Sequence, residues 1–214
     1  MRKVFIINGL PGSGKGTQAV KIADELNLVH ISSGQLIRDA INENTEQDFI
    51  AEIRKRVEKG IPQPDDVVNK LVENKISSLS LDSGIIFDSY PITIPQAEYL
   101  LKISNNYKLE APIFIYLKVD PESVIKRLST RKICDRCGLP VVAGDNEEKC
   151  KKCGGNLITR SDDTEEVVHN RINNYTPLLK DMVEFYRLNG KIIEINGDQT
   201  VPEVSKDIKT ALND

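Results

Sequence analysis

The sequence predicts an α/β fold of three layers, in which helices cover both faces of a five-stranded parallel sheet. Two observations predict this fold. Short apolar segments rich in Ile, Val and Phe alternate with longer amphipathic segments, as they do in strand–helix–strand units. The chain has 214 residues, of which 39% are hydrophobic, which is enough for one domain with a buried core.

Five short segments are predicted as strands because their β-branched and aromatic residues favour buried, pleated positions. They are residues 3–7, 29–31, 85–87, 113–117 and 191–195. The third of them ends at Asp88, which places a carboxylate at the end of an apolar strand.

Amphipathic segments between and after these strands are predicted as helices. They are residues 15–26, 34–43, 46–59, 65–79, 95–103, 121–131 and 201–212, and a long helix that starts after Asp163. Pro121 suits a first helical position, and Asp163-Thr164-Glu165-Glu166 has the form of a capped helix start. Pro177 lies inside the long helix, where a proline predicts a kink or a break.

Hydropathy and charge exclude several classes of protein. The longest uninterrupted apolar run is 113–117, whereas a membrane span needs about 20 residues. The apolar start of the chain stops at Asn8, short of the apolar region of a signal peptide, which has about 7–15 residues. The net charge of −3 argues against salt-driven binding of nucleic acid. We therefore expect a cytoplasmic protein without a membrane or nucleic-acid partner.

Four cysteines lie close together, with the spacing C-x2-C-x12-C-x2-C. They are Cys134, Cys137, Cys150 and Cys153. Two Cys-x-x-Cys turns can close a tetrahedron of thiolates around zinc, and four sulfurs leave no open position for catalysis. The alternatives are two disulfides, which a cytosolic chain disfavours, or four unrelated thiols, which the clustering disfavours. The polar segment 132–156 has little core of its own, so a structural zinc would supply its stability.

A glycine-rich loop joins the first strand to the first helix. Residues 9–17 read Gly-Leu-Pro-Gly-Ser-Gly-Lys-Gly-Thr. Such a loop presents backbone N–H groups to phosphates at a helix N-terminus. Gly16 stands where Ser or Thr is usual, and Thr17 follows one place later. The alternative is a strand–helix turn without a ligand. The loop in this context predicts a P-loop NTPase type of fold.

Three segments match one enzyme family. Residues 9–18 match G-x-P-G-x-G-K-G-T-Q without a gap. Residues 31–38 are similar to I-S-T-G-D-M-L-R, and residues 87–97 are similar to L-D-G-F-P-R-T-x-x-Q-A. With these motifs the chain resembles the nucleoside monophosphate kinases, and adenylate kinase in particular. The cysteine segment resembles the zinc-bearing lid of the long form of that family.

The resemblance implies reversible, magnesium-dependent phosphoryl transfer from ATP to AMP, which gives two ADP. It divides the chain into a core (1–31, 64–130 and 165–214), a monophosphate-binding segment (32–63) and a zinc-binding lid (131–164). It implies ATP and AMP as ligands, Zn in the lid, Mg with the ATP, and a monomer.

The resemblance also implies site residues. The catalytic set is Lys15, Asp88, Arg127, Arg131, Arg160 and Arg171. The ATP-binding set is Gly12, Ser13, Gly14, Lys15, Gly16, Thr17, Arg127 and Gln199. The AMP-binding set is Ser33, Arg38, Gln63, Ser89, Gln96, Arg160 and Arg171. Guanidinium groups suit phosphate oxygens, the Asp88 carboxylate suits hydrated magnesium, and the Gln96 amide is expected to read adenine.

Four positions depart from the family pattern, all on the acceptor side. Ile92 replaces an arginine, Ser89 a glycine, Tyr90 a phenylalanine and Gln35 an aspartate. We expect a nearby basic cluster to replace the lost arginine in part: Arg54, Lys55, Arg56 and Lys59. Three alternatives stay open: a kinase for UMP, CMP or GMP, an inactive nucleotide-binding relative, and a zinc-ribbon binding module. The ribbon has no aromatic residue for base stacking between its first and last cysteines.

Overall fold

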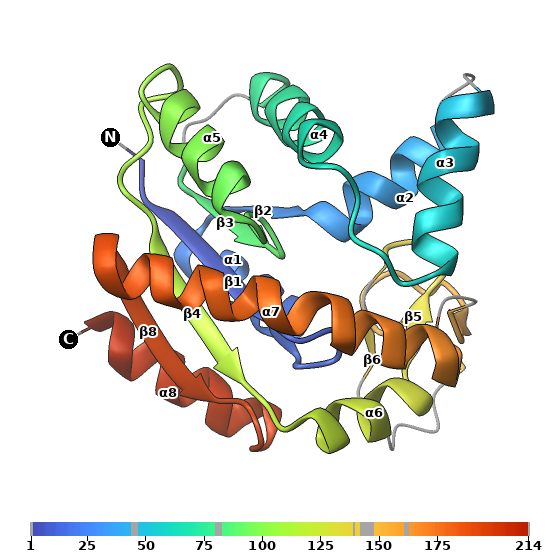
Figure 1. Cartoon of the computed structure of the whole chain (residues 1–214). Coiled ribbons are helices and arrows are strands. Elements are labelled where there is room, and N and C mark those ends of the chain that lie inside the picture. The colour runs from blue at the N-terminus through green and yellow to red at the C-terminus, as the bar shows by residue number, and fades with distance from the viewer. Residues whose placement is uncertain are drawn as a thin grey trace.

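The core of the protein is a five-stranded parallel sheet with the strand order β2-β3-β1-β4-β8 (Figure 1). The computed structural model describes residues 2–43, 47–79, 83–138, 140–141, 148–160 and 163–213. The strands are β1 (Val4–Gly9), β2 (Val29–Ser32), β3 (Ile85–Asp88), β4 (Ile113–Lys118) and β8 (Lys191–Asn196). The prediction of five parallel strands is confirmed.

Helices lie between the strands in chain order. They are α1 (Lys15–Leu26), α2 (Ser33–Glu43), α3 (Gln47–Glu58), α4 (Asp65–Ser77), α5 (Ile94–Ser104), α6 (Pro121–Ser129), α7 (Glu165–Asn189) and α8 (Val201–Asn213). Pro177 does not divide α7, which continues through it. Packing compensates for the missing N–H, because α7 buries residues on both sides of the proline, among them Ile172 and Met182.

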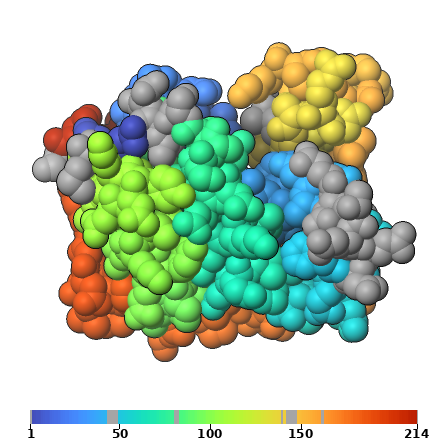
Figure 2. Space-filling view, turned by 90° about the horizontal axis from the view of Figure 1, so that it is seen from above, coloured from blue at the N-terminus to red at the C-terminus, as the bar shows by residue number. Residues whose placement is uncertain are grey.

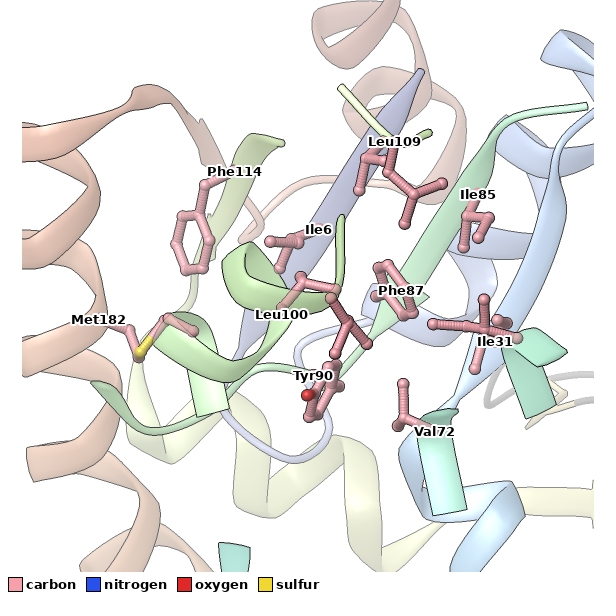
Figure 3. Packing of buried hydrophobic residues seen from close by; sticks show 14 of the residues in the cluster. Ile6, Ile31, Val72, Ile85, Phe87, Tyr90, Leu100, Leu109, Phe114 and Met182 are labelled. Carbon is pink, nitrogen blue, oxygen red and sulfur yellow. The ribbon is translucent and has the colours of Figure 1, made fainter. Parts of the chain in front are cut away.

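The two faces of the sheet bury two separate apolar clusters. Neighbouring side chains of a strand point to opposite faces, so Ile6 packs under α4, α5 and α7, whereas Ile7 packs under α1 and α8. Figure 3 shows Ile6, Phe87 and Phe114 of the first cluster. Burying one such side chain contributes about 1.5–3 kcal/mol. This burial holds the helices against both faces of the sheet, so the prediction of three layers is confirmed.

A small antiparallel sheet forms the insertion between α6 and α7. Its strands are β5 (Lys132–Cys134), β6 (Pro140–Val141) and β7 (Leu157–Ile158), in the order β6-β5-β7. Figure 2 shows the insertion, in yellow and orange, as a lobe beside α2. Among the described residues, no helix is both long enough and apolar enough to span a membrane.

Candidate active site

The loop between β1 and α1 has the geometry of a phosphate cradle. Gly12 and Gly14 have φ angles of 88° and 91°, which side chains rarely adopt. A Cβ atom on Gly9 would lie 2.7 Å from the carbonyl oxygen of Leu117. The backbone N–H groups of the first turn of α1 lack acceptors inside the helix. The loop can therefore bind an anion at the helix N-terminus.

Lys15 begins α1 and donates a hydrogen bond of 3.3 Å to the carbonyl oxygen of Leu10. Burial lowers the pKa of Lys15 to about 8. Asp88 opposes this shift, and the cations Arg131, Arg171 and Arg160 add to it. A buried ammonium group among three guanidinium groups is stabilised by an anionic ligand between them.

Asp88 lies at the end of β3, beside the first turn of α1. A Cβ atom on Gly16 would lie 3.2 Å from Asp88 Oδ2. Burial raises the pKa of Asp88, but the His30 imidazole, whose Nε2 lies 3.5 Å from Asp88 Oδ2, the charge of Lys15 and the Ser89 hydroxyl outweigh it, so the pKa lies below its usual value. The carboxylate is therefore ionised at neutral pH, as a contact to hydrated magnesium requires.

A buried carboxylate holds two of the predicted arginines. Arg131 donates to Asp163 Oδ2 and Oδ1 over 2.8 and 2.6 Å, and Arg171 donates to Oδ1 over 3.3 Å. The Asp163 side chain has no exposed surface. Burial and Arg160 lower the pKa of Arg131, and Asp163 opposes the shift. The sequence indicates Asp163 only as a helix-start residue, so its position between the arginines is a finding of the structure.

Arg127 lies apart from these arginines, on α6. It donates hydrogen bonds to the carbonyl oxygens of Gly197 (2.8 Å) and Ser13 (3.4 Å). Gln199 donates to the carbonyl oxygen of Asn196 over 2.9 Å. The backbone contacts hold the Arg127 guanidinium group between the phosphate loop and the turn before α8.

Two cavities meet at Lys15. The larger, of about 930 Å³, is lined by the phosphate loop, Arg127, Gln199, the lid and the start of α8. The smaller, of about 180 Å³, lies between the loop, α2, the segment after α3, and α7. Lys15, Arg131 and Arg160 line both. Phosphates bound in the two cavities would therefore share these cations.

The structure brings most of the predicted acceptor residues to the smaller cavity. Its lining includes Ser33, Arg38, Gln63, Ser89, Arg160 and Arg171. Gln96 lines neither cavity and is fully buried. Its Nε2 donates to Asp65 Oδ1 over 2.7 Å, and its Oε1 accepts from the Ile92 N–H over 2.8 Å. Both ends of the Gln96 amide thus have partners inside the protein.

The four cysteine sulfurs all lie within 4.8 Å of one another. The Cys134 and Cys153 sulfurs are 3.4 Å apart, and those of Cys137 and Cys150 are 3.7 Å apart. Tetrahedral zinc with bonds of about 2.3 Å places its sulfurs about 3.8 Å apart. Burial raises the pKa of Cys134, but the Cys137 and Arg136 backbone N–H groups outweigh it and lower the value to about 7. The four thiols therefore fit a zinc ion.

Comparison with known proteins agrees with this geometry. The family model described as adenylate kinase matches residues 7–191. The chain is 38% identical over 212 residues to an adenylate kinase of Petrotoga mobilis, which covers 97% of this chain and 95% of the relative. An adenylate kinase of Thermoanaerobacter sp. is 37% identical over 215 residues, which covers 98% of this chain and 97% of the relative. This chain belongs to the adenylate kinase family.

Two residues that depart from the family pattern on the acceptor side make hydrogen bonds in the structure. Ser89, where the family has glycine, has a φ angle of 62°, and its hydroxyl donates to Asp88 Oδ1 over 3.1 Å. The hydrogen bond offsets part of the strain of that backbone conformation. Gln35, where the family has aspartate, accepts from Arg38 Nη2 over 2.8 Å. Both substitutions therefore contact a predicted site residue.

The basic cluster at the C-terminal end of α3 does not line the acceptor site. Arg54, Lys55, Arg56 and Lys59 line neither cavity. Arg56 instead donates to the carbonyl oxygen of Pro62 over 2.9 Å and lies 3.7 Å from Glu52. The structure therefore does not support compensation from this cluster, and the Arg56 guanidinium group is held by contacts within its own segment.

Proposed function

We propose that the protein is an adenylate kinase, which transfers the terminal phosphoryl group of ATP to AMP and forms two ADP. The observation that carries the proposal is the meeting of two cavities at Lys15, with Arg131 and Arg160 lining both. Phosphoryl transfer needs aligned nucleotides and neutralised charge more than it needs covalent chemistry by the protein. The shared cations supply that charge where the phosphates would meet.

ATP is proposed to occupy the larger cavity. The residues assigned to it are Gly12, Ser13, Gly14, Lys15, Gly16, Thr17, Arg127 and Gln199, all of which line that cavity. The loop amides and Lys15 would bind the phosphates. Magnesium bound with ATP would offset the negative charge of the phosphates. Thr17 and the ionised Asp88 line the same cavity and would hold its hydration shell.

AMP is proposed to occupy the smaller cavity, where the Arg38 guanidinium group would bind its phosphate. The assigned residues that line this cavity are Ser33, Arg38, Gln63, Ser89, Arg160 and Arg171. Gln96, which the resemblance also assigns to AMP, lies buried behind the cavity and bonds the Ile92 N–H. An oxygen of the AMP phosphate attacks the terminal phosphorus of ATP, and the bond from that phosphorus to the bridging oxygen breaks. Lys15, Arg131, Arg160 and Arg171 would stabilise the charge on the transferred group.

The proposed organisation follows the division expected from the sequence. Residues 1–31, 64–130 and 165–214 form the core, 32–63 the monophosphate-binding segment and 131–164 the lid. We assign the four cysteines to a structural zinc ion that replaces an apolar core in the lid. Thiolate ligands persist in a reducing compartment, so we propose that the protein is cytoplasmic. We also propose that it is a monomer and that its partners are nucleotides.

A coupled assay with ATP, magnesium and a panel of AMP, CMP, UMP and GMP tests this proposal. AMP should be the preferred acceptor, and Lys15→Ala should lower turnover by at least about 100-fold while the thermal unfolding midpoint changes little. Preference for another monophosphate would favour the other kinases of the family. If no monophosphate is turned over, the kinase proposal is rejected, and the hypotheses of an inactive nucleotide-binding relative and of a zinc-ribbon binding module remain.

A further inference from the structure

We infer that Gln18 is a positioning residue for the donor nucleotide, because it fixes the start of α8 relative to the phosphate loop. This inference rests on the proposed function, since it concerns the ATP that is proposed to occupy the larger cavity. Gln18 is the last residue of the motif 9–18, but it is assigned to neither nucleotide.

The Gln18 side chain is bonded at both ends of its amide. It lies in the first turn of α1, and the residue is only 2% exposed. Its Nε2 donates a hydrogen bond of 3.0 Å to the carbonyl oxygen of Val201, and its Oε1 accepts one of 2.8 Å from the Ser205 hydroxyl. A carbonyl oxygen only accepts, so the amino end of the amide must face Val201. The two bonds therefore set the direction of the amide and its distance from α8.

Both partners of Gln18 lie at the start of α8, four residues apart and so on one face of the helix. Helices α1 and α8 also share an apolar cluster, to which Ala19 and Ile208 belong. Apolar contacts are not directional, so they allow one helix to slide along the other. Two hydrogen bonds to residues one turn apart do not allow this. Gln18 therefore determines where α8 begins relative to α1.

The start of α8 forms part of the wall of the larger cavity. Val201, Pro202 and Val204 line this cavity, together with Gln199 and Thr200 of the turn before α8 and with the phosphate loop. Apolar side chains suit the base of a nucleotide, whereas the loop suits its phosphates. A ligand that reaches both parts depends on the distance between them, and Gln18 links the two parts.

The other contacts of the turn before α8 come from different elements. Arg127, on α6, donates to the Gly197 carbonyl oxygen over 2.8 Å and to that of Ser13 in the loop over 3.4 Å, a long bond. The Gly197 N–H donates to the carbonyl oxygen of Lys118 over 2.7 Å. These bonds hold the turn from α6 and β4, whereas Gln18 holds α8 itself from the helix that follows the loop.

Calorimetry of Gln18→Met, which removes both bonds at nearly constant volume, tests the inference. The ligands are a non-hydrolysable ATP analogue and inorganic tripolyphosphate, each with magnesium. Affinity for the analogue should fall about 3- to 10-fold, and affinity for tripolyphosphate, which needs only the loop, should stay at the wild-type value. The KM for ATP should rise by the same factor while the KM for AMP stays constant. Equal losses for both ligands, or no loss for either, would overturn the inference.

Glu25→Gln is the matched control. Glu25 of α1 pairs with Lys209 of α8 over 2.8 Å, and both side chains are exposed. Neither residue lines a cavity, so the variant removes a contact between the same two helices away from the proposed ATP site. Both affinities should stay at the wild-type values. A selective loss of analogue binding as large as that of Gln18→Met would show that any loosening of the two helices has this effect, and would overturn the specific role of Gln18.

Ser205→Ala keeps the inference testable if Gln18→Met folds poorly. It removes one of the two bonds and should weaken binding of the analogue by about 2- to 5-fold without an effect on tripolyphosphate. In that case, unchanged binding of the analogue would overturn the inference.

The inference and the proposed function fail on different results. Turnover of ATP and AMP by the wild type, with no selective effect of Gln18→Met, rejects the role of Gln18 and leaves the kinase proposal intact. A wild-type protein without turnover rejects the proposed function, and the inference with it.

Discussion

Arg131 binds the Asp163 carboxylate through two parallel hydrogen bonds, from Nε over 2.8 Å and from Nη2 over 2.6 Å. Asp163 Oδ1 also accepts from Arg171 over 3.3 Å. The two arginines lie at opposite ends of the lid insertion along the chain, so one carboxylate holds both at the smaller cavity. Bidentate pairing fixes the direction of a guanidinium group as well as its distance.

Replacing Asp163 should therefore reduce catalysis more than substrate binding. In Asp163→Asn, one acceptor oxygen becomes an amino group that faces arginine N–H groups. We expect kcat to fall about 10- to 100-fold because the arginines lose their alignment with the transferred group. Steady-state kinetics measures this effect. Glu194→Gln, in the exposed pair with Arg187, is the matched control and should keep wild-type kinetics. A wild-type kcat in Asp163→Asn would contradict the positioning role.

Nucleotide binding should weaken at alkaline pH because of Lys15. The pKa of this lysine is lowered to about 8 by burial in the free protein, and bound phosphates would raise it. Affinity is then constant below pH 8 and falls as the pH rises above it, by at most about tenfold per pH unit. Calorimetry with a non-hydrolysable ATP analogue at pH 7, 8 and 9 measures this. Lys15→Arg should show no such decrease, and an equal decrease in both proteins would exclude Lys15 as its source.

Contiguous motifs predicted the parts of the site whose residues are neighbours in the chain. The phosphate loop and the cysteine pairs depend on local backbone geometry, which spacing determines. Asp163 could not be predicted as the partner of Arg131, because the two are 32 positions apart and Asp163 has the sequence context of a helix cap. The burial of Gln96 and its bonds to Asp65 and to the Ile92 N–H could not be predicted, because an isolated glutamine does not reveal its partners. Of the kink or break predicted at Pro177, the break is wrong, because packing against the core outweighs one lost hydrogen bond.

The buried hydroxyl of Tyr90 should contribute measurably to stability. Tyr90 is fully buried and donates a hydrogen bond of 2.7 Å to Asn69 Oδ1. Tyr90→Phe leaves that buried amide oxygen unpaired, so the free energy of unfolding should fall by about 1–3 kcal/mol. Denaturant titration measures the change.

Tyr186 provides the matched control for Tyr90. It is also buried, and its hydroxyl has no hydrogen-bond partner among the residues that the structure describes. Tyr186→Phe should therefore leave the free energy of unfolding unchanged or raise it. A loss of stability as large as that of Tyr90→Phe would show that the hydrogen bond to Asn69 is not the cause.

Zinc removal should destabilise the lid before the core. We expect about one zinc ion per chain, since the four sulfurs form one site. Chelation should lower the unfolding temperature and increase proteolysis within 131–164 first, because the described residues of this segment belong to no large apolar cluster. Metal analysis of Cys150→Ser, which removes a buried ligand, should show less zinc than wild type. A zinc-free protein of unchanged stability would reject the structural role.

Ile92→Arg should improve the use of AMP. Ile92 lines the smaller cavity, and the family has an arginine at this position. A charge-assisted hydrogen bond contributes about 1.5–3 kcal/mol, so a restored arginine could lower the KM for AMP by about 10- to 150-fold. The basic side chains at 54–56 and 59 do not line this cavity, so the gain should not be masked by them. Ile92→Met, which changes shape without charge, should keep the wild-type KM. If Ile92→Arg also leaves KM unchanged, the cations already lining the cavity, among them Arg38 and Arg171, are sufficient for the acceptor phosphate.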